Sequence, residues 1–301
     1  MNVIKEMPLF LTERAITVYL RRLKDYCELT KPRLSALVVF TGAMGYLMAT
    51  QFPISVWDFV VTLIGIYLIV GGANGLNQVW ERDRDRLMER TRHRPLPSGR
   101  IVPLEGTVVS LIMAILGWVL LVATSAYGLA GWVALAALLI YVLCYTPMKT
   151  RTWLCTFVGA LAGASPPVIG WFAGGGGLTF VPLILFVLQY LWQLPHFWSI
   201  GHRYRDEYKK AGFRVMPEEG TAAISVATLS SSLFLILFAT TLLKVQPSLL
   251  IFLVGLLLNG WLLFAATRFA LKSSDATAKG LLMTVDCWLP AFLILLVIVG
   301  L

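Results

Sequence analysis

The sequence predicts an all-α, polytopic membrane protein whose chain crosses the bilayer nine times. Of its 301 residues, 58% are hydrophobic, and the mean hydropathy is +0.77. Soluble domains contain roughly 45–50% apolar residues. Charged residues and Pro/Gly punctuation divide the chain into nine apolar segments, and all but one of the 25 Lys and Arg residues fall before the first segment or in alternate connections. These two patterns together predict the fold class.

Each apolar segment has about the length of a membrane helix. Roughly 20 residues, rising about 1.5 Å each, cross the hydrocarbon core of a bilayer. In chain order the segments lie near residues 34–50, 57–80, 104–125, 128–146, 154–173, 179–199, 221–243, 247–267 and 280–301. We therefore expect a single transmembrane domain over residues 31–301, without a separate soluble domain.

The cations predict the orientation, because cytoplasmic loops collect Lys and Arg. They precede the first segment and follow the second, fourth, sixth and eighth, whereas the opposite connections hold only Lys244. The N-terminus is thus expected to be cytoplasmic and the C-terminus outside. Residues 1–30 have no apolar core of a signal peptide. Their apolar stripe, beside four cations, predicts an amphipathic helix on the cytoplasmic membrane surface; the stripe and the cations are Ile16, Leu20, Leu23 and Cys27, and Arg14, Arg21, Arg22 and Lys24.

The most informative polar residues follow the second apolar segment, in the run NGLNQVWERDRDRLMERTRHR at 74–94. If the helix continues, four oxygen-bearing side chains fall at offsets of 3, 4 and 4 and share one face; they are Asn74, Asn77, Glu81 and Asp85. A carboxylate at membrane depth costs about 2.5–3.5 kcal/mol on the mildest insertion scale, so such groups usually mark function. The alternative is a polar helix end that simply reaches the interface.

Oxygen ligands one helical turn apart suit a hard divalent cation. Mg²⁺ keeps several waters and usually takes one or two carboxylates together with phosphate oxygens of a substrate. The incomplete ligand set on this face therefore predicts Mg²⁺ bound together with a diphosphate.

Dense cations follow the acidic face and could neutralise that diphosphate. Arginine forks match phosphate geometry. Arg90 and Arg94 lie four residues apart beside the acidic face, and Lys149 and Arg151 form another inner basic site. The alternative for any single Arg is a solvated inner loop that follows the membrane topology. We expect cations from separate loops to converge over one cavity.

A second polar cluster leaves the sixth apolar segment. His196 follows Pro195 in an apolar aromatic stretch. A helix interruption there would free backbone carbonyls and open a polar pocket, in which the imidazole could bind a metal or move a proton. His202 is a weaker candidate, Asp206 is a candidate second metal ligand, and the role of Asp286 in the last segment is left open.

Several other functions lack support in the sequence. The net charge of +9 follows the membrane topology and requires no nucleic-acid partner. The chain contains no P-loop, Rossmann fingerprint, G-x-S-x-G or H-E-x-x-H motif. Its four cysteines show no C-x-x-C spacing, which favours packing roles.

Taken together, these motifs resemble the haem-farnesylating branch of the UbiA-type intramembrane prenyltransferases. The first signature of that family is N-D-x-x-D-x-x-x-D at the inner end of the second helix. Asn77, Glu81 and Asp85 match it, whereas Gln78 replaces the first Asp. Other matching runs, spread over almost the whole chain, are Glu28–Arg33, Arg90–Gly99, Lys149–Thr152, Leu194–Phe197 and Asp206-x-Tyr208.

The resemblance implies nine helices around a central cavity open to the cytoplasmic side, and a farnesyl chain in an apolar tunnel. It also implies that farnesyl diphosphate loses diphosphate with the help of Mg²⁺, and that the allylic carbocation alkylates a vinyl group of haem B to give haem O. The setting would be a bacterial plasma membrane, with possible hand-off to a haem-modifying enzyme or a terminal oxidase assembly.

The resemblance also implies roles for the matched residues. The metal would be held by Asn77, Glu81, Asp85 and Asp206, and the leaving diphosphate by Arg90, Arg94, Lys149 and Arg151. Asn74 would orient the ligands, and His196 would contact haem iron or assist proton transfer. An aromatic wall would exclude water from the cation; its candidates are Trp192, Phe197 and Trp198.

Two other functions stay open from the sequence. A related prenyltransferase could act on an aromatic quinone precursor, although Gln78, Glu81 and the run Pro195–Phe197 argue against it. A transporter or a non-enzymatic haem-binding protein would also use charges within the membrane. Its charges should line both sides of a path, whereas these crowd the inner end.

Overall fold

The structure is a computed structural model that describes residues 9–50, 54–217, 221–243 and 248–300. Every regular element in these ranges is helical, and nine helical stretches among them are long and apolar enough to cross a membrane. The protein is therefore an integral membrane protein, as predicted. The helices are α1 (Leu9–Leu29), α2 (Pro32–Ala49), α3 (Val56–Asp85), α4 (Pro103–Ala123), α5 (Leu129–Leu139), α6 (Thr146–Met148), α7 (Cys155–Gly163), α8 (Ser165–Ala173), α9 (Phe180–Arg203), α10 (Arg205–Lys210), α11 (Thr221–Leu243), α12 (Leu249–Leu271) and α13 (Asp275–Val299).

Two predicted segments are divided in the structure. The fourth consists of α5, a π-helical stretch at Ile140–Tyr145, and α6. The fifth is divided at Ala164, between α7 and α8, two residues before Pro166, which Pro167 follows. Proline lacks the amide proton that an unbroken helix needs, which explains a division at this place.

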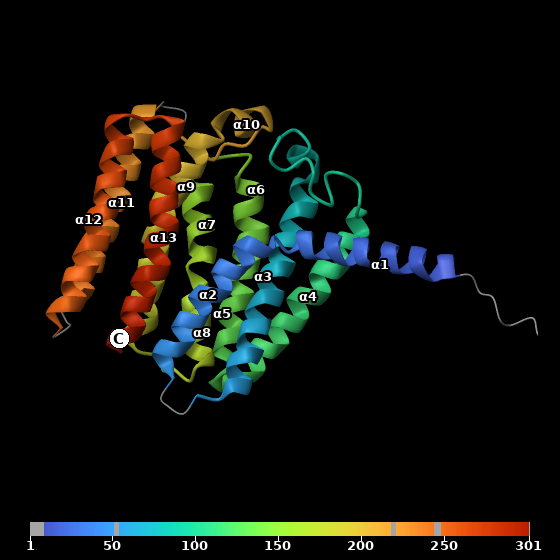
Figure 1. Cartoon of the computed structure of the whole chain (residues 1–301), viewed down its shortest axis with the longest axis horizontal. Coiled ribbons are helices and arrows are strands. Elements are labelled where there is room, and N and C mark those ends of the chain that lie inside the picture. Colours follow the sequence, from blue (N-terminus) through green and yellow to red (C-terminus); the bar gives the residue numbers. More distant parts are fainter. Residues whose placement is uncertain (1–8, 51–53, 218–220, 244–247, 301) are drawn as a thin grey trace, which may run out of the picture.

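The helices form a bundle with α11 and α12 at one edge and α3 and α4 at the opposite edge (Figure 1). One apolar core joins α9 to α11, α12 and α13, and a second joins α2, α3, α5 and α8. Contact between α2 and α8 requires glycine, because a Cβ at Gly170 would lie 1.8 Å from the Gly42 carbonyl oxygen and one at Gly45 would lie 1.9 Å from that of Pro167. Small residues allow membrane helices this close an approach.

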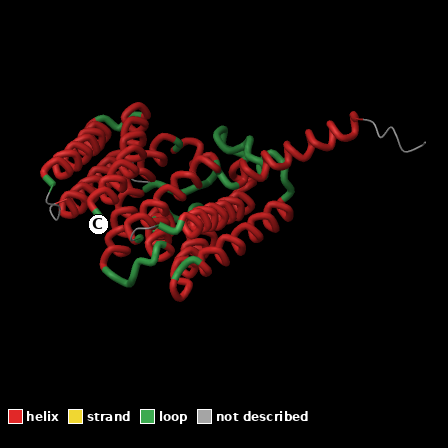
Figure 2. The backbone as a smooth tube through the Cα atoms, turned by 60° about the horizontal axis from the view of Figure 1, so that its bottom comes forward, coloured by secondary structure: helices red, strands yellow, loops and turns green. Residues whose placement is uncertain are grey.

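Helix α1 leaves the bundle sideways in both views (Figures 1 and 2). Its last turns are attached by Arg22 and Tyr26, which bind Glu105 at the start of α4, and by an ion pair between Asp25 and Arg100. The expected apolar stripe at Ile16, Leu20 and Leu23 is exposed in the chain alone. Arg14 and Lys244, which entered the sequence predictions, lie outside the residues whose side chains are described.

One expectation about α9 is wrong. The sequence led us to expect an interruption at Pro195, but α9 continues through this proline to Arg203. The Ser199 hydroxyl donates a hydrogen bond of 2.6 Å to the Pro195 carbonyl. The polar groups near His196 therefore come from side chains of packed helices, and no break in α9 supplies them.

Candidate functional site

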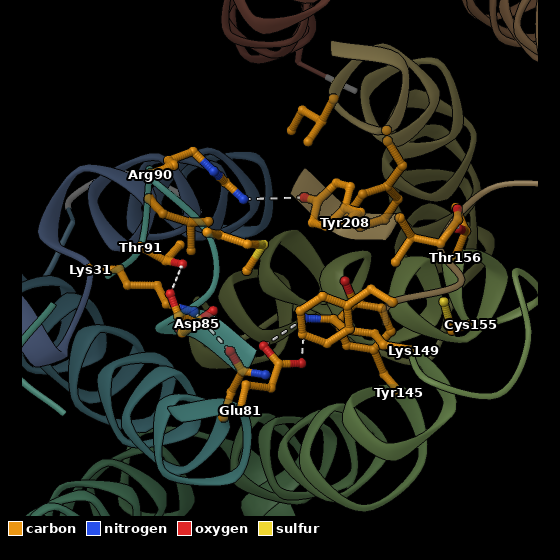
Figure 3. A pocket seen from close by; sticks show the side chains of 18 of the residues that line it. Lys31, Glu81, Asp85, Arg90, Thr91, Tyr145, Lys149, Cys155, Thr156 and Tyr208 are labelled. Carbon is orange, nitrogen blue, oxygen red and sulfur yellow. Dashed lines mark hydrogen bonds and ion pairs between the residues drawn. The ribbon is translucent and has the colours of Figure 1, made fainter. Parts of the chain in front are cut away.

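The polar end of α3 forms one wall of a cavity. Helix α3 runs unbroken to Asp85, so its residues keep the helical spacing that the sequence predicted. Asn77, Glu81 and Asp85 all line the cavity, and each is at most 5% exposed. The cavity has a volume of about 170 Å³ and lies at the end of the bundle that carries α10 and the loop after α3 (Figures 1 and 3).

Each of these three residues is paired with a cation from a different segment. The ammonium of Lys31, just before α2, donates to Asn77 Oδ1 at 2.9 Å. Lys149, just after α6, lies 2.8 Å from Glu81 Oε1, and Arg94 lies 2.9 Å from Asp85 Oδ2. Figure 3 shows Lys31 and Lys149, from two separate connections, pointing toward Glu81 and Asp85 of α3. The predicted convergence of Arg94 and Lys149 on the acidic face is therefore present in the structure.

The electrostatic environment of the two lysines differs. Although burial acts to lower the pKa of Lys149, Glu81 and the neighbouring tyrosines raise it well above its ordinary value. Burial, together with the charges of Arg94 and Lys149, lowers the pKa of Lys31 to about 7 against the opposing effect of Glu81 and Asp85. Cations packed this closely repel one another, so the cavity favours an anion among them.

The oxygen atoms that line the cavity fit a divalent cation whose remaining ligands are waters or substrate oxygens. Among the described residues no group of three His, Cys, Asp or Glu side chains could hold a metal ion alone. Two carboxylates and one amide remain, which is the kind of partial set that Mg²⁺ completes with waters and phosphate oxygens. Lys149 donates its hydrogen bond to Glu81 Oε2, whereas buried Oε1, although close to the ammonium, accepts no hydrogen bond. That oxygen keeps a lone pair for another ligand.

Asn74 and Gln78 do not line the cavity. Asn74 donates to the Thr30 carbonyl at 3.2 Å and to the Ser35 hydroxyl at 3.3 Å. Gln78 donates to the Leu29 carbonyl at 2.6 Å and is fully buried. Both amides therefore hold the connection between α1 and α2 against α3. This contact gives Gln78 a structural reason to differ from the Asp of the motif.

Arg90 lines the cavity from the opposite side. It donates a hydrogen bond of 3.2 Å to the Tyr208 hydroxyl, and its guanidinium lies 4.6 Å from the ring centroid of Tyr204 (Figure 3). Its backbone amide donates to Glu207 at 3.3 Å. Arg90 thus connects the loop after α3 to the segment after α9, and its side chain forms no ion pair with an acidic residue in the described part of the chain.

Two predicted site residues do not reach this cavity. Arg151 is exposed and is absent from the lining, although it lies two residues from Lys149. The side chain of Asp206 is 92% exposed, and it lines a second hollow, beside Lys209 and Arg214. The structure therefore does not bring Arg151 to the other cations, or Asp206 to the other proposed metal ligands.

The two histidines also lie outside the lining. His196 faces α13 and bonds Asp286, whereas buried His202 contacts Arg205 near the end of α9. The cavity-facing residues of α9 are Phe197, Ile200 and Gly201. Of the predicted aromatic wall only Phe197 lines the cavity, because Trp192 and Trp198 are packed in the core formed with α11–α13.

Sequence reasoning missed two groups in the cavity wall. Lys31 lies within a matching run but carried no predicted role; its position before Pro32, at a helix start with a positive φ of 53°, is the available signal. Tyr145 lines the cavity with its ring centroid 4.6 Å from the Lys149 ammonium, and nothing in its spacing distinguishes it from a core aromatic residue.

Comparison with known proteins identifies relatives of the whole chain. The UbiA prenyltransferase family matches residues 38–297. A protoheme IX farnesyltransferase of Solibacter usitatus is 36% identical over 285 residues, covering 89% of this chain and 96% of the relative. One of Christiangramia forsetii is 40% identical over 271 residues, covering 85% and 87%.

Solved structures share the fold. A structure from work on digeranylgeranylglyceryl phosphate synthase has a TM-score of 0.76 at 20% identity and covers 93% of this chain and 99% of that chain. A UbiA homolog from Archaeoglobus fulgidus bound to GPP and Mg²⁺ has a TM-score of 0.63 at 14% identity, covering 91% and 100%. These likenesses show that the chain has the fold of these proteins.

Proposed function

The chain belongs to the UbiA prenyltransferase family, and we propose that it transfers a farnesyl group from farnesyl diphosphate to a vinyl group of haem B, giving haem O and diphosphate. The observation that carries this proposal is the pairing of Asn77, Glu81 and Asp85 with three cations in one buried cavity. Carboxylate and amide oxygens suit Mg²⁺, and the cations suit the diphosphate. The haem acceptor is supported by the relatives, which carry the name protoheme IX farnesyltransferase.

Asn77, Glu81 and Asp85 are the proposed metal ligands, and Lys31, Arg90, Arg94 and Lys149 are the proposed diphosphate contacts. Bound Mg²⁺ would neutralise charge on the diphosphate and make it a better leaving group. Binding of Mg²⁺ and diphosphate would also separate the Lys149–Glu81 and Arg94–Asp85 ion pairs, because the metal binds the carboxylate oxygens and the diphosphate binds the cations. Asp206 and Arg151 are left out of this assignment because of their exposed positions.

The proposed reaction begins when the bond between farnesyl C1 and the diphosphate oxygen breaks, and the electron pair leaves with the diphosphate. Lys149 and Arg94 would stabilise the charge that develops there. The haem vinyl group then attacks the allylic cation and forms the new carbon–carbon bond. Water adds to the resulting cation and loses a proton. Tyr145, Phe197 and Phe213 line the cavity and would shield the first cation from early capture by water.

We assign the chain to a bacterial plasma membrane, with a cytoplasmic N-terminus and the C-terminus outside. The basic loop after α3, α10 and the connection from α12 to α13 lie at one end of the bundle (Figure 1), which supports this orientation. Residues 1–30 would be a membrane-surface segment attached to a single domain over 31–301.

Reporter fusions at the C-terminus test the orientation, since a periplasmic alkaline phosphatase signal is expected and a cytoplasmic one would reverse the assignment. A downstream haem-modifying enzyme or terminal oxidase assembly would receive the product.

The reaction itself is tested with purified protein in nanodiscs, supplied with haem B, farnesyl diphosphate and Mg²⁺. Mass spectrometry should detect haem carrying a hydroxyethylfarnesyl group, and Asp85→Asn should yield almost none. A parallel reaction replaces haem with 4-hydroxybenzoate, an aromatic quinone precursor. Product from that acceptor alone would replace the haem assignment, and product from neither would contradict the enzyme assignment.

A further inference from the structure

A second polar pair, half-buried, lies outside the cavity lined by Asn77, Glu81 and Asp85, between α9 and α13. His196 Nδ1 and Asp286 Oδ1 are 2.7 Å apart, with side chains 20% and 40% exposed. Asp286 lies eleven residues after the start of α13, about 16 Å along the helix at 1.5 Å per residue. An ionisable pair at such a depth is expensive and usually functional.

The hydrogen bond determines which nitrogen of His196 is available. When the imidazole is neutral and its Nδ1 proton is donated to the Asp286 carboxylate, the free lone pair is on Nε2. Among the described residues, the hydrogen-bond partner of the His196 side chain is Asp286, and Nε2 has no partner there. A carboxylate in this place also makes the imidazole a stronger electron-pair donor, as in histidines that ligate metals.

Packing holds the imidazole plane in place. Trp192 stacks on His196 with ring centroids 5.0 Å apart and an interplanar angle of 25°. The indole of Trp192 donates a hydrogen bond of 2.7 Å to the carbonyl of Val285, the residue before Asp286. The tryptophan thus fixes both the ring and the helix that carries its carboxylate partner.

A row of aromatic rings connects this pair to the diphosphate cavity. Tyr145, which lines the cavity, lies 6.5 Å from Phe197, and Phe197 lies 5.9 Å from His196, between ring centroids. His196 therefore lies next to Phe197, which lines the cavity, but does not line the cavity itself. A large planar acceptor could extend along this row with its reacting edge at the cavity.

We propose that Asp286 is a positioning residue that holds His196 Nε2 as the axial ligand of the iron in the haem acceptor. The inference rests on the proposed function, because it takes haem B as the acceptor. Asp286 fixes the tautomer and strengthens the donor, whereas His196 contacts the substrate. The pair thereby sets where the macrocycle lies relative to the cleaving diphosphate.

The test is haem binding to the full chain in nanodiscs without farnesyl diphosphate, followed by absorption spectra and a redox titration. His196→Gly should lose the histidine-ligated spectrum and regain it when imidazole is added. Asp286→Asn should weaken haem binding roughly 10- to 100-fold and raise the reduction potential, because a weaker donor stabilises ferric iron less. Asp286→Glu should recover most of both losses, and His93→Ala, at an exposed histidine, should match the wild type.

Unchanged spectrum, affinity and potential in Asp286→Asn would overturn the inference. A normal spectrum with slower turnover and a shifted pH profile would also overturn it, since that result assigns the pair to proton transfer. If Asp286→Asn does not fold, failure of imidazole to restore His196→Gly overturns it instead. Wild-type formation of farnesylated haem, measured in parallel, shows whether the failure belongs to this inference alone or to the proposed function.

Discussion

The C-terminal ends of α3 and α9 look alike in sequence, since each apolar helix runs into polar and then basic residues, but they are used differently. The polar face of α3 stays together, and Asn77, Glu81 and Asp85 enter one cavity. The polar residues of α9 and the following α10 separate, because His196 of α9 faces α13 and Asp206 of α10 lies on the surface.

Helical continuity explains the difference. Offsets of four residues hold along α3 because it is unbroken to its last carboxylate. Helix α9 ends at Arg203, and Tyr204, with φ −112° and ψ 21°, leaves helical geometry before α10 begins. The angular relation between His196 and Asp206 is lost at that point, so spacing in the sequence no longer predicts a shared face.

The largest expected effect is a difference in kcat between two variants, each of which removes one carboxylate from one of the two regions. Asp85→Asn should lower kcat about 10²- to 10³-fold, because it removes a group that acts on developing charge in a buried site. Asp206→Asn should change kcat less than about fivefold, as expected for an exposed charge. Farnesylated haem measured over time by mass spectrometry gives both rates. Equal losses in the two variants would contradict the contrast.

The next effect compares two cations two residues apart. Lys149→Met should lower kcat/KM for farnesyl diphosphate about 100-fold, near the lower range for removing one member of a buried charge pair. Arg151→Met is the matched control and should stay close to the wild type, because its side chain is exposed. A loss at Arg151 as large as that at Lys149 would mean that the cavity recruits a further loop.

A smaller effect concerns the exchange of partners in the cavity. Lys149→Met frees Glu81 from its ion pair, so Mn²⁺ should bind about tenfold more tightly in the absence of diphosphate, whereas inorganic diphosphate should bind more weakly. Electron paramagnetic resonance of free Mn²⁺ measures the first, and calorimetry measures the second. Weaker binding of both ligands would indicate that Lys149 only supports the packing.

The smallest expected effect concerns Tyr208, a polar residue of the second region that does line the cavity. Tyr208→Phe removes one hydrogen bond to Arg90, which is worth about 0.5–1.5 kcal/mol, so kcat/KM should fall roughly two- to tenfold. Initial rates at several farnesyl diphosphate concentrations measure this. No change would show that the aromatic rings at positions 204 and 208 hold Arg90 without this hydrogen bond.

Much of the fold was predictable because membrane helices follow from local composition. The nine spans and the polar face of α3 depend on hydropathy and helical spacing, which are properties of neighbouring residues. The course of α9 through Pro195 was not predictable, since packing against α11 and α13 decides it. Proline disfavours a helix locally, and tertiary contacts compensate.

The site was most predictable where its residues share one helix, as Asn77, Glu81 and Asp85 do on α3. Arg94 and Lys149 were proposed as cations for the α3 face, but which loop residue reaches it depends on how separate helices pack. Lys31 escaped notice because one lysine near a membrane surface usually follows topology. Asn74 shares the helical face, yet it bonds Thr30 and Ser35 rather than lining the cavity.

The most direct test of the α3 site is an anomalous difference map from crystals grown with Mn²⁺ and farnesyl thiodiphosphate, an analogue that resists cleavage. We predict a manganese peak within coordination distance of Asn77, Glu81 and Asp85, with Lys149 and Arg94 moved from the carboxylates to the diphosphate. A peak beside Asp206, or a diphosphate bound while the Lys149–Glu81 and Arg94–Asp85 pairs stay intact, would contradict it.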